Sequence, residues 1–170
     1  MSEASPAPLV VNGWTLFAHP LFLDQLERLV QQVEGLRQKD PMGYLQKNAS
    51  KRLAAITRLV FEVIPQDPTR QTYRQGHTLG DAHTHWFRAK FFQQYRLFFR
   101  YHAPSRVIVF AWVNDEQTRR AYEQADDAYQ VFSQMLARGY PPDDWATLLA
   151  EARAAAPRWT PLATRPPPEP

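Results

Sequence analysis

The sequence predicts an α+β fold in which an N-terminal helical hairpin packs on a twisted antiparallel β-sheet and C-terminal helices follow. The first observation is that apolar residues recur at helical spacing in two consecutive segments, 20–39 and 44–64. The second is that three strand-like runs, 85–91, 95–101 and 106–114, then follow one another through short turns. Helices followed by a group of strands, rather than alternating with them, are typical of this class.

The N-terminal part of the chain contains a strand candidate and then the two helices. Residues 9–18 can form a short strand that is interrupted at Asn12-Gly13. The first helix follows Pro20 and is expected to end near Lys39, because the next residues are Asp40-Pro41. The link to the second helix is short, which favours an antiparallel arrangement of the two.

The three strand-like runs differ in their patterns. Residues of opposite character alternate in the first two, so each of these strands has one apolar face. If they pair as a hairpin with their apolar faces together, their opposite faces form one continuous surface. The third run is apolar on both faces from Val107 to Trp112, so we expect it to lie centrally in the sheet.

The surface opposite the apolar face is expected to carry cations and rings. Its members are Trp86, Arg88 and Lys90 from the first run and Arg96, Arg100 and His102 from the second. Residues 85–106 contain no Asp or Glu, whereas acids gather near 115–127 and 143–151. Guanidinium and ammonium groups hold phosphates and exposed rings stack on bases, so this pattern indicates RNA binding. The alternative is a solvated sheet face whose cations discourage edge-to-edge association.

The C-terminal part predicts two further helices and a tail. Apolar residues between Ala128 and Leu136 mark a helix, and Gly139 stands where a left-handed C-cap is required. The segment 141–144, Pro-Pro-Asp-Asp, then begins a short helix. Beyond Pro157 the chain is rich in proline and is not expected to build a core.

Length and composition indicate one globular domain. The chain has 170 residues, of which 44% are apolar, and we expect a single domain over residues 9–156 between disordered tails at 1–8 and 157–170. The absence of cysteine excludes a disulfide scaffold, a thiol nucleophile and a thiolate metal site. No apolar run approaches the ~20 residues that cross a bilayer, so we expect a soluble, cytoplasmic protein.

His83-Thr84-His85 places two imidazoles at strand spacing, which suggests a metal site. A zinc site needs three or four ligands, and no Asp, Glu or His stands at companion spacing. We therefore expect no metal and no cofactor.

The segment after the third strand-like run has two interpretations. Asn114 or Asp115 can cap a following helix, with Tyr122 as a packing ring. Beside a cationic surface, however, Tyr122 or Glu116 can donate or accept a proton.

Two sets of these residues resemble known toxin families. The first set resembles the core of the RelE/ParE toxin superfamily: Arg74-x-Gly-x-x-Leu79-Gly80, Trp86-x-Arg88-x-Lys90, Tyr95–Phe98, and Asn114–Glu116 with Tyr122. The second set spans about Val11 to Leu149 and is similar to the YhaV family of type II toxins. Its motifs are Val11–Trp14, His19-Pro20, Tyr95–Tyr101, Trp112–Glu116, Ala128–Leu136 and Gly139–Trp145.

The resemblance implies a ribosome-associated endoribonuclease, an mRNA interferase, that a partner antitoxin neutralises in a hetero-oligomer. It also implies an antitoxin of the PrlF type, with a swapped-hairpin DNA-binding fold through which the complex binds operator DNA. In RelE-like nucleases, basic residues on two central strands hold the scissile phosphate, and a later residue, often Tyr, transfers protons. The matching residues of this sequence are Arg88, Lys90, Arg96 and Tyr122.

We therefore expect metal-independent cleavage in which the ribose 2′-hydroxyl attacks the adjacent phosphorus. The expected catalytic residues are Arg88, Arg96, Tyr122 as general acid and Glu116 as base, with His85 as a second candidate for the base. The expected RNA-binding residues are Lys90, Arg100, Trp86 and Arg119. Two alternatives stay open: a ParE-like toxin that is not a nuclease and binds a protein such as DNA gyrase, and a DNA-binding regulator that acts with its antitoxin.

Overall fold

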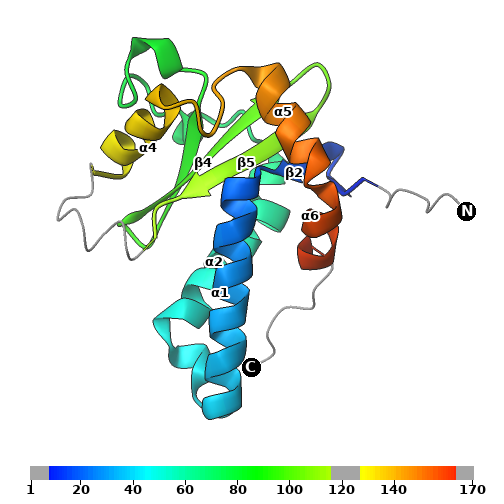
Figure 1. Ribbon diagram of the computed structural model, residues 1–170, viewed down its shortest axis with the longest axis vertical. Coiled ribbons are helices and arrows are strands. Elements are labelled where there is room, and N and C mark those ends of the chain that lie inside the picture. The colour runs from blue at the N-terminus through cyan, green and yellow to red at the C-terminus, as the bar shows by residue number, and fades with distance from the viewer. Residues whose placement is uncertain (1–7, 116–126, 164–170) are drawn as a thin grey trace, which may run out of the picture.

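The computed structural model describes residues 8–115 and 127–163, which form a five-stranded sheet between two groups of helices (Figure 1). The strands are β1 (Val10–Val11), β2 (Trp14–Ala18), β3 (Phe87–Phe91), β4 (Tyr95–His102) and β5 (Val107–Val113). The α-helices are α1 (Pro20–Lys39), α2 (Asn48–Arg58), α4 (Asp127–Ala137), α5 (Trp145–Ala154) and α6 (Ala156–Ala163). No helix within the described ranges is long and apolar enough to cross a membrane.

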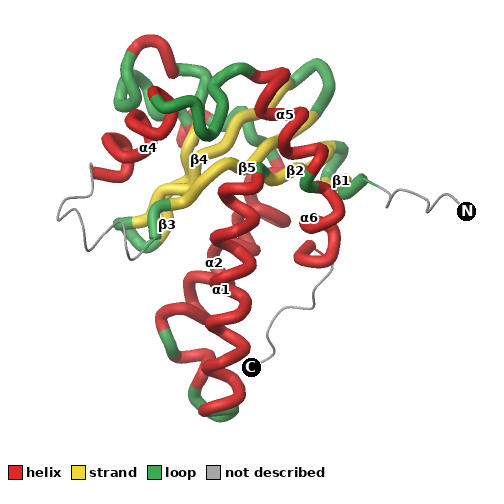
Figure 2. Tube along the Cα trace, viewed as in Figure 1, coloured by secondary structure: helices red, strands yellow, loops and turns green. Residues whose placement is uncertain are grey.

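The sheet is mixed, and its strand order is β1-β2-β5-β4-β3 (Figure 2). Strands β3, β4 and β5 form an antiparallel meander, and β1 pairs antiparallel with β2. Strand β2 runs parallel to β5, with Leu16 opposite Ile108. The expectation of a purely antiparallel sheet is therefore wrong, because the helices carry the chain from β2 to the far edge before it returns to β5. The central position expected for β5 is confirmed, and all its residues are buried.

The interruption expected at Asn12-Gly13 is the turn of a small hairpin. Val11 lies opposite Trp14 in the register, so only two residues connect β1 and β2. Both turn residues have positive φ, 51° for Asn12 and 81° for Gly13. Asn and Gly are the residues that adopt this conformation most readily, which explains why the strand reverses here.

Helix α1 begins and ends where the sequence predicts. His19 is its N-cap, and the ring nitrogen Nδ1 accepts a hydrogen bond from the Leu21 N–H at 3.2 Å. Its buried residues are Phe22, Leu23, Leu26, Leu29 and Val33, which follow the helical spacing seen in the sequence. The side-chain amide of Gln25 bonds both main-chain groups of Val113, so α1 is fixed to the end of β5.

The second helical segment is one α-helix flanked by shorter helical turns. These turns are the 3₁₀ turns Tyr44–Gln46 and Ile64–Gln66 and the π-helical turn Leu59–Val63. The helix expected over 44–64 is confirmed for residues 48–64, but it does not begin at Tyr44, because Lys47 has an extended backbone between the first turn and α2. Helices α1 and α2 contact each other and project together away from the sheet (Figure 1).

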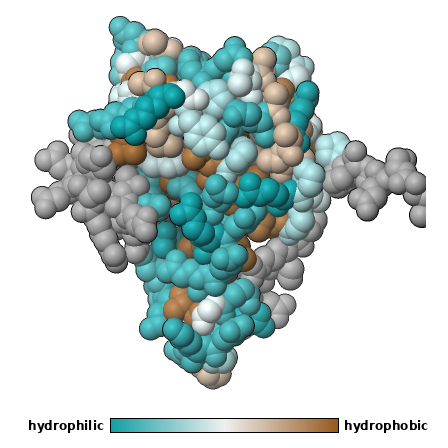
Figure 3. All heavy atoms as spheres, viewed as in Figure 1, coloured by the Kyte–Doolittle hydropathy of each residue, from teal (hydrophilic) through white to brown (hydrophobic). Residues whose placement is uncertain are grey.

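Apolar side chains form two cores, one on each face of the sheet. The larger core lies against α1, α2 and α6 and includes Phe22, Phe99 and Phe110. The second lies against α4 and α5 and includes Phe98 and Phe132. The fold is therefore a three-layer arrangement with the sheet in the middle. The visible surface of the helical projection is mostly hydrophilic, and apolar atoms show mainly where it joins the sheet (Figure 3).

The two helices expected after residue 127 are confirmed, together with their caps. After α4, Gly139 has a φ of 83°, its N–H bonds the Leu136 carbonyl, and the N–H of Tyr140 bonds the Met135 carbonyl. Asp144 caps α5, because its side chain accepts a hydrogen bond from the Thr147 N–H at 3.0 Å.

The expectation that the chain beyond Pro157 builds no core is wrong for residues 157–163. These residues belong to α6, and Trp159 is only 1% exposed. Its ring stacks on Phe61, with centroids 5.2 Å apart, and Arg158 forms ion pairs with Asp24 and Glu27 on α1. The proline content predicted a disordered tail, but the tertiary contacts of Trp159 and Arg158 stabilise a helix here.

Candidate nucleic-acid interface

The cations of the β3–β4 hairpin share one face of the sheet, as the alternation predicts. In the antiparallel register Lys90 lies opposite Arg96, and Arg88 lies opposite Phe98. Opposed residues of paired strands project from the same face, so these three cations are neighbours. They face the layer that contains α4.

The middle of this face is covered rather than open. The ring of Phe98 stacks on Phe132 of α4 with centroids 4.3 Å apart, and Tyr129 packs edge-on at 5.7 Å. Trp86 is completely buried and packs against Phe132 as well. The expectation that Trp86 offers a ring for base stacking is therefore wrong, because the ring belongs to the second core. The cations lie around the rim of this covered region.

Arg88 is held at the rim by two hydrogen bonds. Its Nε donates to the hydroxyl of Tyr129 at 2.9 Å, and its Nη1 donates to the carbonyl of Thr72 at 2.8 Å. The side chain is half-buried, so the guanidinium is fixed in direction before any ligand binds. Preorganised donors of this kind bind a phosphate with little loss of side-chain freedom.

Arg96 is anchored still more firmly and is only 8% exposed. Its Nη1 donates to the carbonyls of Gln93 and Tyr95, at 2.6 Å and 2.9 Å. The guanidinium therefore closes the turn between β3 and β4, where Phe92 and Gln93 have positive φ. Its buried Nε has no hydrogen-bond partner among the described residues.

Asn114 holds the same turn from the other side. Its Oδ1 accepts a hydrogen bond from the Arg96 N–H at 2.6 Å, and its Nδ2 donates to the carbonyl of Gln94 at 2.9 Å. Asn114 was expected to cap a helix, but its described side-chain contacts stabilise the β3–β4 turn instead. Nothing in the sequence pattern pairs residue 114 with the turn, since the contact spans 20 residues.

Lys90 completes the rim and is exposed to solvent. Within residues 8–115 and 127–163, no carboxylate forms an ion pair with Arg88, Lys90 or Arg96. We call these three residues the cationic rim. An unneutralised group of neighbouring cations attracts a polyanion.

Arg100 has a different environment from the cationic rim. Its guanidinium lies between the rings of Trp86 and Trp145, at 5.4 Å and 5.3 Å from their centroids. Its Nη1 donates to the main-chain carbonyl of Asp143. Burial lowers the pKa of Arg100, and the carboxylates of Asp143 and Asp144 oppose that effect. These contacts give Arg100 a structural role that joins β4 to the start of α5.

A polar cluster adjoins Arg100. His83 Nδ1 and His85 Nε2 lie 3.2 Å and 2.7 Å from the Oδ1 of Asp143, and Trp86 Nε1–H donates to the same oxygen at 2.8 Å. Burial alone would raise the pKa of Asp143, but the hydrogen bonds from Trp86 and His85 and the nearby imidazoles lower it. The expectation that no acid accompanies the two histidines is wrong, because Asp143 reaches them from 58 residues beyond His85.

Three expected site residues, Glu116, Arg119 and Tyr122, lie outside the described residues. The structure therefore brings together only the part of the expected site that β3 and β4 carry. The chain reaches Asp115 at the end of β5, next to Asn114 and the β3–β4 turn.

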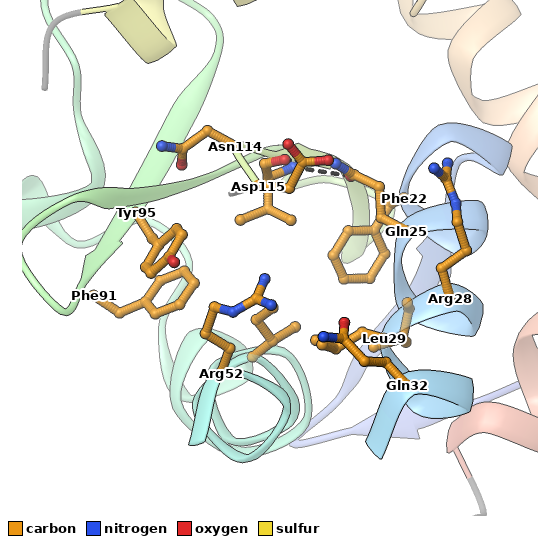
Figure 4. A pocket seen from close by; sticks show the side chains of 13 residues that line it. Phe22, Gln25, Arg28, Leu29, Gln32, Arg52, Phe91, Tyr95, Asn114 and Asp115 are labelled. Atoms are coloured by element: carbon orange, nitrogen blue, oxygen red, sulfur yellow. Dashed lines mark hydrogen bonds between the residues drawn. The ribbon is translucent and has the colours of Figure 1, made fainter. Parts of the chain in front are cut away.

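A cavity of about 300 Å³ lies between α1, α2 and the ends of β3, β4 and β5 (Figure 4). The guanidinium of Arg52 points into it, 5.8 Å from the ring centroid of Tyr95. Arg52 is 8% exposed, and its Nε has no hydrogen-bond partner in the ranges that the structure describes. Within the described part of the chain Arg52 makes no ion pair either. Sequence reasoning missed this residue, because an Arg in an amphipathic helix normally indicates a solvated face.

The family model and the most similar proteins that match this chain are all toxins. A family described as "Toxin with endonuclease activity, of toxin-antitoxin system" matches residues 16–153. The ribonuclease toxin YhaV of Escherichia coli strain K12 is 47% identical over 146 residues, which are 85% of this chain and 95% of the relative. The toxins YhaV of Escherichia coli O157:H7 and O6:H1 are 47% and 46% identical over the same shares. No solved structure gives a significant match.

The match covers β3, β4 and β5 with the cationic rim, most of β2 and α5, and the helices α1, α2 and α4. It defines the class as a toxin of a toxin–antitoxin system with endonuclease activity. The chain belongs to the YhaV family of these toxins. A non-nuclease toxin that binds DNA gyrase, the alternative left open by the sequence, is not favoured by this result.

Proposed function

We propose that this chain is an endoribonuclease that cleaves mRNA without a metal ion, and that the cationic rim of β3 and β4 binds the scissile phosphate. The observation that carries the proposal is the register of the hairpin. It sets Lys90 beside Arg96, with Arg88 two residues along the same face, and no described carboxylate neutralises them. The endonuclease activity of the family and the ribonuclease name of the Escherichia coli K12 relative support it.

The proposed reaction is an internal transfer at phosphorus. A base removes the proton of the ribose 2′-hydroxyl, and the 2′-oxygen then forms a bond to the adjacent phosphorus. The bond from phosphorus to the 5′-oxygen breaks, and a general acid protonates that oxygen as it leaves. The products are a 2′,3′-cyclic phosphate and a 5′-hydroxyl, and the step needs no water, metal or redox partner.

The negative charge that develops on the non-bridging oxygens is the part of this reaction that fixed cations stabilise most. We assign this role to Arg88 and Arg96, whose hydrogen bonds to Tyr129, Thr72 and the β3–β4 turn hold them in place. Lys90, which is exposed, holds the RNA backbone. Arg100 and Trp86, with their partners in the second core, position β4 rather than contact RNA.

Tyr122 is the proposed general acid and Glu116 the proposed base. Both follow closely in the sequence on Asp115, where the first described range ends. Arg119 would add to the phosphate contacts. His85 is the second candidate for the base, and its Nε2 lies 2.7 Å from Asp143 Oδ1.

The finer features of the system are also proposals. We infer a RelE/ParE-type fold, an action on mRNA at the ribosome, and an antitoxin of the PrlF type that forms a hetero-oligomer and brings the complex to operator DNA. Because a free toxin must be restrained, we propose that acidic groups of the antitoxin cover the cationic rim.

The test compares purified variants on a defined RNA in excess EDTA. Lys90→Ala should lower kcat/KM about tenfold, and it should reduce the salt dependence of RNA binding by roughly one phosphate contact. Lys51→Ala is the matched control, since Lys51 is an exposed lysine on α2 outside the cationic rim. Equal rates for Lys90→Ala and Lys51→Ala would contradict the assignment of the RNA site to this face.

A further inference from the structure

Three side chains of metal-ligand type, His83, His85 and Asp143, meet on the surface of the protein. Their ligand atoms all lie within 4.8 Å of one another, and all three side chains are partly exposed. Two come from the turn that precedes β3, and the third comes from the connection between α4 and α5. Among the described residues this is the group of His, Asp and Glu side chains that could hold a metal ion.

We propose that His83 Nδ1, His85 Nε2 and an oxygen of Asp143 form a binding site for a divalent transition-metal ion of the zinc class. Two imidazole nitrogens and one carboxylate oxygen are a donor set that suits Zn²⁺ and its neighbours rather than Mg²⁺ or Ca²⁺. Ligand atoms placed tetrahedrally at about 2.0–2.1 Å from zinc are about 3.3 Å apart. The His83–Asp143 separation of 3.2 Å already has this value, and the His85–Asp143 separation of 2.7 Å needs a small opening.

The residues around Asp143 fix the position and orientation of its carboxylate. The indole N–H of Trp86, a fully buried ring, donates to Asp143 Oδ1 at 2.8 Å. The guanidinium of Arg100 bonds the main-chain carbonyl of Asp143, and the next residue, Asp144, caps α5. Outer contacts of this kind orient a ligand and are a regular part of metal sites.

The number of ligands decides the kind of site. Structural zinc ions are closed by four protein ligands, whereas three protein ligands leave a position for water or another group. We therefore infer an exchangeable ion that ties the turn before β3 to the start of α5. The cationic rim supplies none of its ligands, and the proposed cleavage assigns the general base to Glu116, so the proposed RNA cleavage does not require the ion.

The experiment titrates the full-length protein, freed of metal, with Zn²⁺ by calorimetry and with Co²⁺ by absorption. We expect one ion per chain, and at a hundredfold excess over Kd the ion should raise the thermal midpoint by about 5–10 °C. His85→Gln and Asp143→Asn should each weaken binding at least about tenfold. Asp143→Asn keeps an oxygen that can accept the Trp86 hydrogen bond, so this variant tests the charge and not the fold.

The chain offers a matched control in His77→Gln. His77 Nδ1 lies 2.7 Å from Asp81 Oδ1 in an exposed pair that has no third ligand within residues 8–115 and 127–163, so this variant should bind the ion like the wild type. No one-to-one binding by the wild type, or binding that His85→Gln and Asp143→Asn leave unchanged, would overturn the site. RNA cleavage in EDTA is a separate readout, so failure of the metal site and failure of the nuclease are distinguished.

Discussion

The indole N–H of Trp159 donates a hydrogen bond to the main-chain carbonyl of Leu16, 3.0 Å away, and so joins the last helix to strand β2. The two residues are 143 positions apart in the chain. Trp159 also packs against Phe22 and Phe61, so α6 closes the larger core over β2, α1 and the π-helical turn after α2.

Trp159→Ala should therefore lower the free energy of unfolding by about 3–5 kcal/mol, since it leaves a large cavity in that core. Trp159→Phe keeps an aromatic ring but loses the hydrogen bond, and should cost less than Trp159→Ala. Urea unfolding followed by tryptophan fluorescence and circular dichroism measures both. A loss below about 0.5 kcal/mol for Trp159→Ala, the value for a surface residue, would show that α6 is not docked.

Asn114→Ala should destabilise the protein by about 2–3 kcal/mol, because it removes two hydrogen bonds and leaves the buried N–H of Arg96 without its acceptor. The same change should slow RNA cleavage, since the turn that orients Arg96 and Lys90 loses its support. Gln93→Asn is the control, because Asn tolerates the positive φ of 61° at this exposed position. Unfolding curves that agree for Asn114→Ala and wild type would refute the proposal that Asn114 stabilises the β3–β4 turn.

The stability of the protein should fall as the pH drops below about 6.5. Burial lowers the pKa of His19 from 6.5, although the carboxylate of Glu151, 3.7 Å from Nε2, opposes this shift. The unfolded chain then binds the proton more tightly than the folded chain, so the stabilisation is complete above the unfolded pKa and is lost towards lower pH. Protonation would also remove the acceptor that caps α1.

His19→Asn tests this dependence, because Asn is a good N-cap and does not titrate. Urea midpoints measured at about pH 7.5 and about pH 5.5 should differ less for His19→Asn than for the wild type. His77→Asn, at an exposed position, should keep the wild-type difference. An identical pH dependence in His19→Asn and wild type would assign the effect to other groups.

Arg52→Met should raise the free energy of unfolding by about 1 kcal/mol or more. The guanidinium is nearly buried beside the cavity and has no ion-pair partner in the described ranges, and Met replaces it with a flexible apolar chain of similar length. The control is Arg58→Met at an exposed position of the same helix, which should change the value by less than about 0.5 kcal/mol. A destabilised Arg52→Met would mean that the charge has a stabilising partner.

Local patterns predict much of this fold. Pro20, Gly139 and Asp144 mark helix ends through the chemistry of caps, and the apolar run of β5 indicates its central position. The parallel pairing of β2 with β5 could not be predicted, because periodicity describes one strand and not its partner. Trp159 was missed for a related reason: its helix is stabilised by docking, in a segment whose composition is typical of a tail.

In the candidate site, too, local patterns predict some features, and tertiary contacts determine the others. Alternation along β3 and β4 places Arg88, Lys90 and Arg96 on one face, and the register agrees. The burial of Trp86 and the meeting of Asp143 with two histidines depend on where α4 and the start of α5 lie against that face. Such contacts join residues 46 to 60 positions apart, which no local pattern encodes.

The most direct measurement is the chemistry of the RNA ends. Purified protein is incubated with a defined RNA in excess EDTA, and the fragments are analysed by denaturing gel and mass spectrometry, with Arg88→Lys, Lys90→Ala and Lys51→Ala alongside. We predict fragments that end in a 2′,3′-cyclic phosphate or a 3′-phosphate, at rates reduced by Arg88→Lys and Lys90→Ala but not by Lys51→Ala. Fragments with 3′-hydroxyl ends, or cleavage that requires an added metal ion, would contradict phosphate binding by the cationic rim as the basis of catalysis.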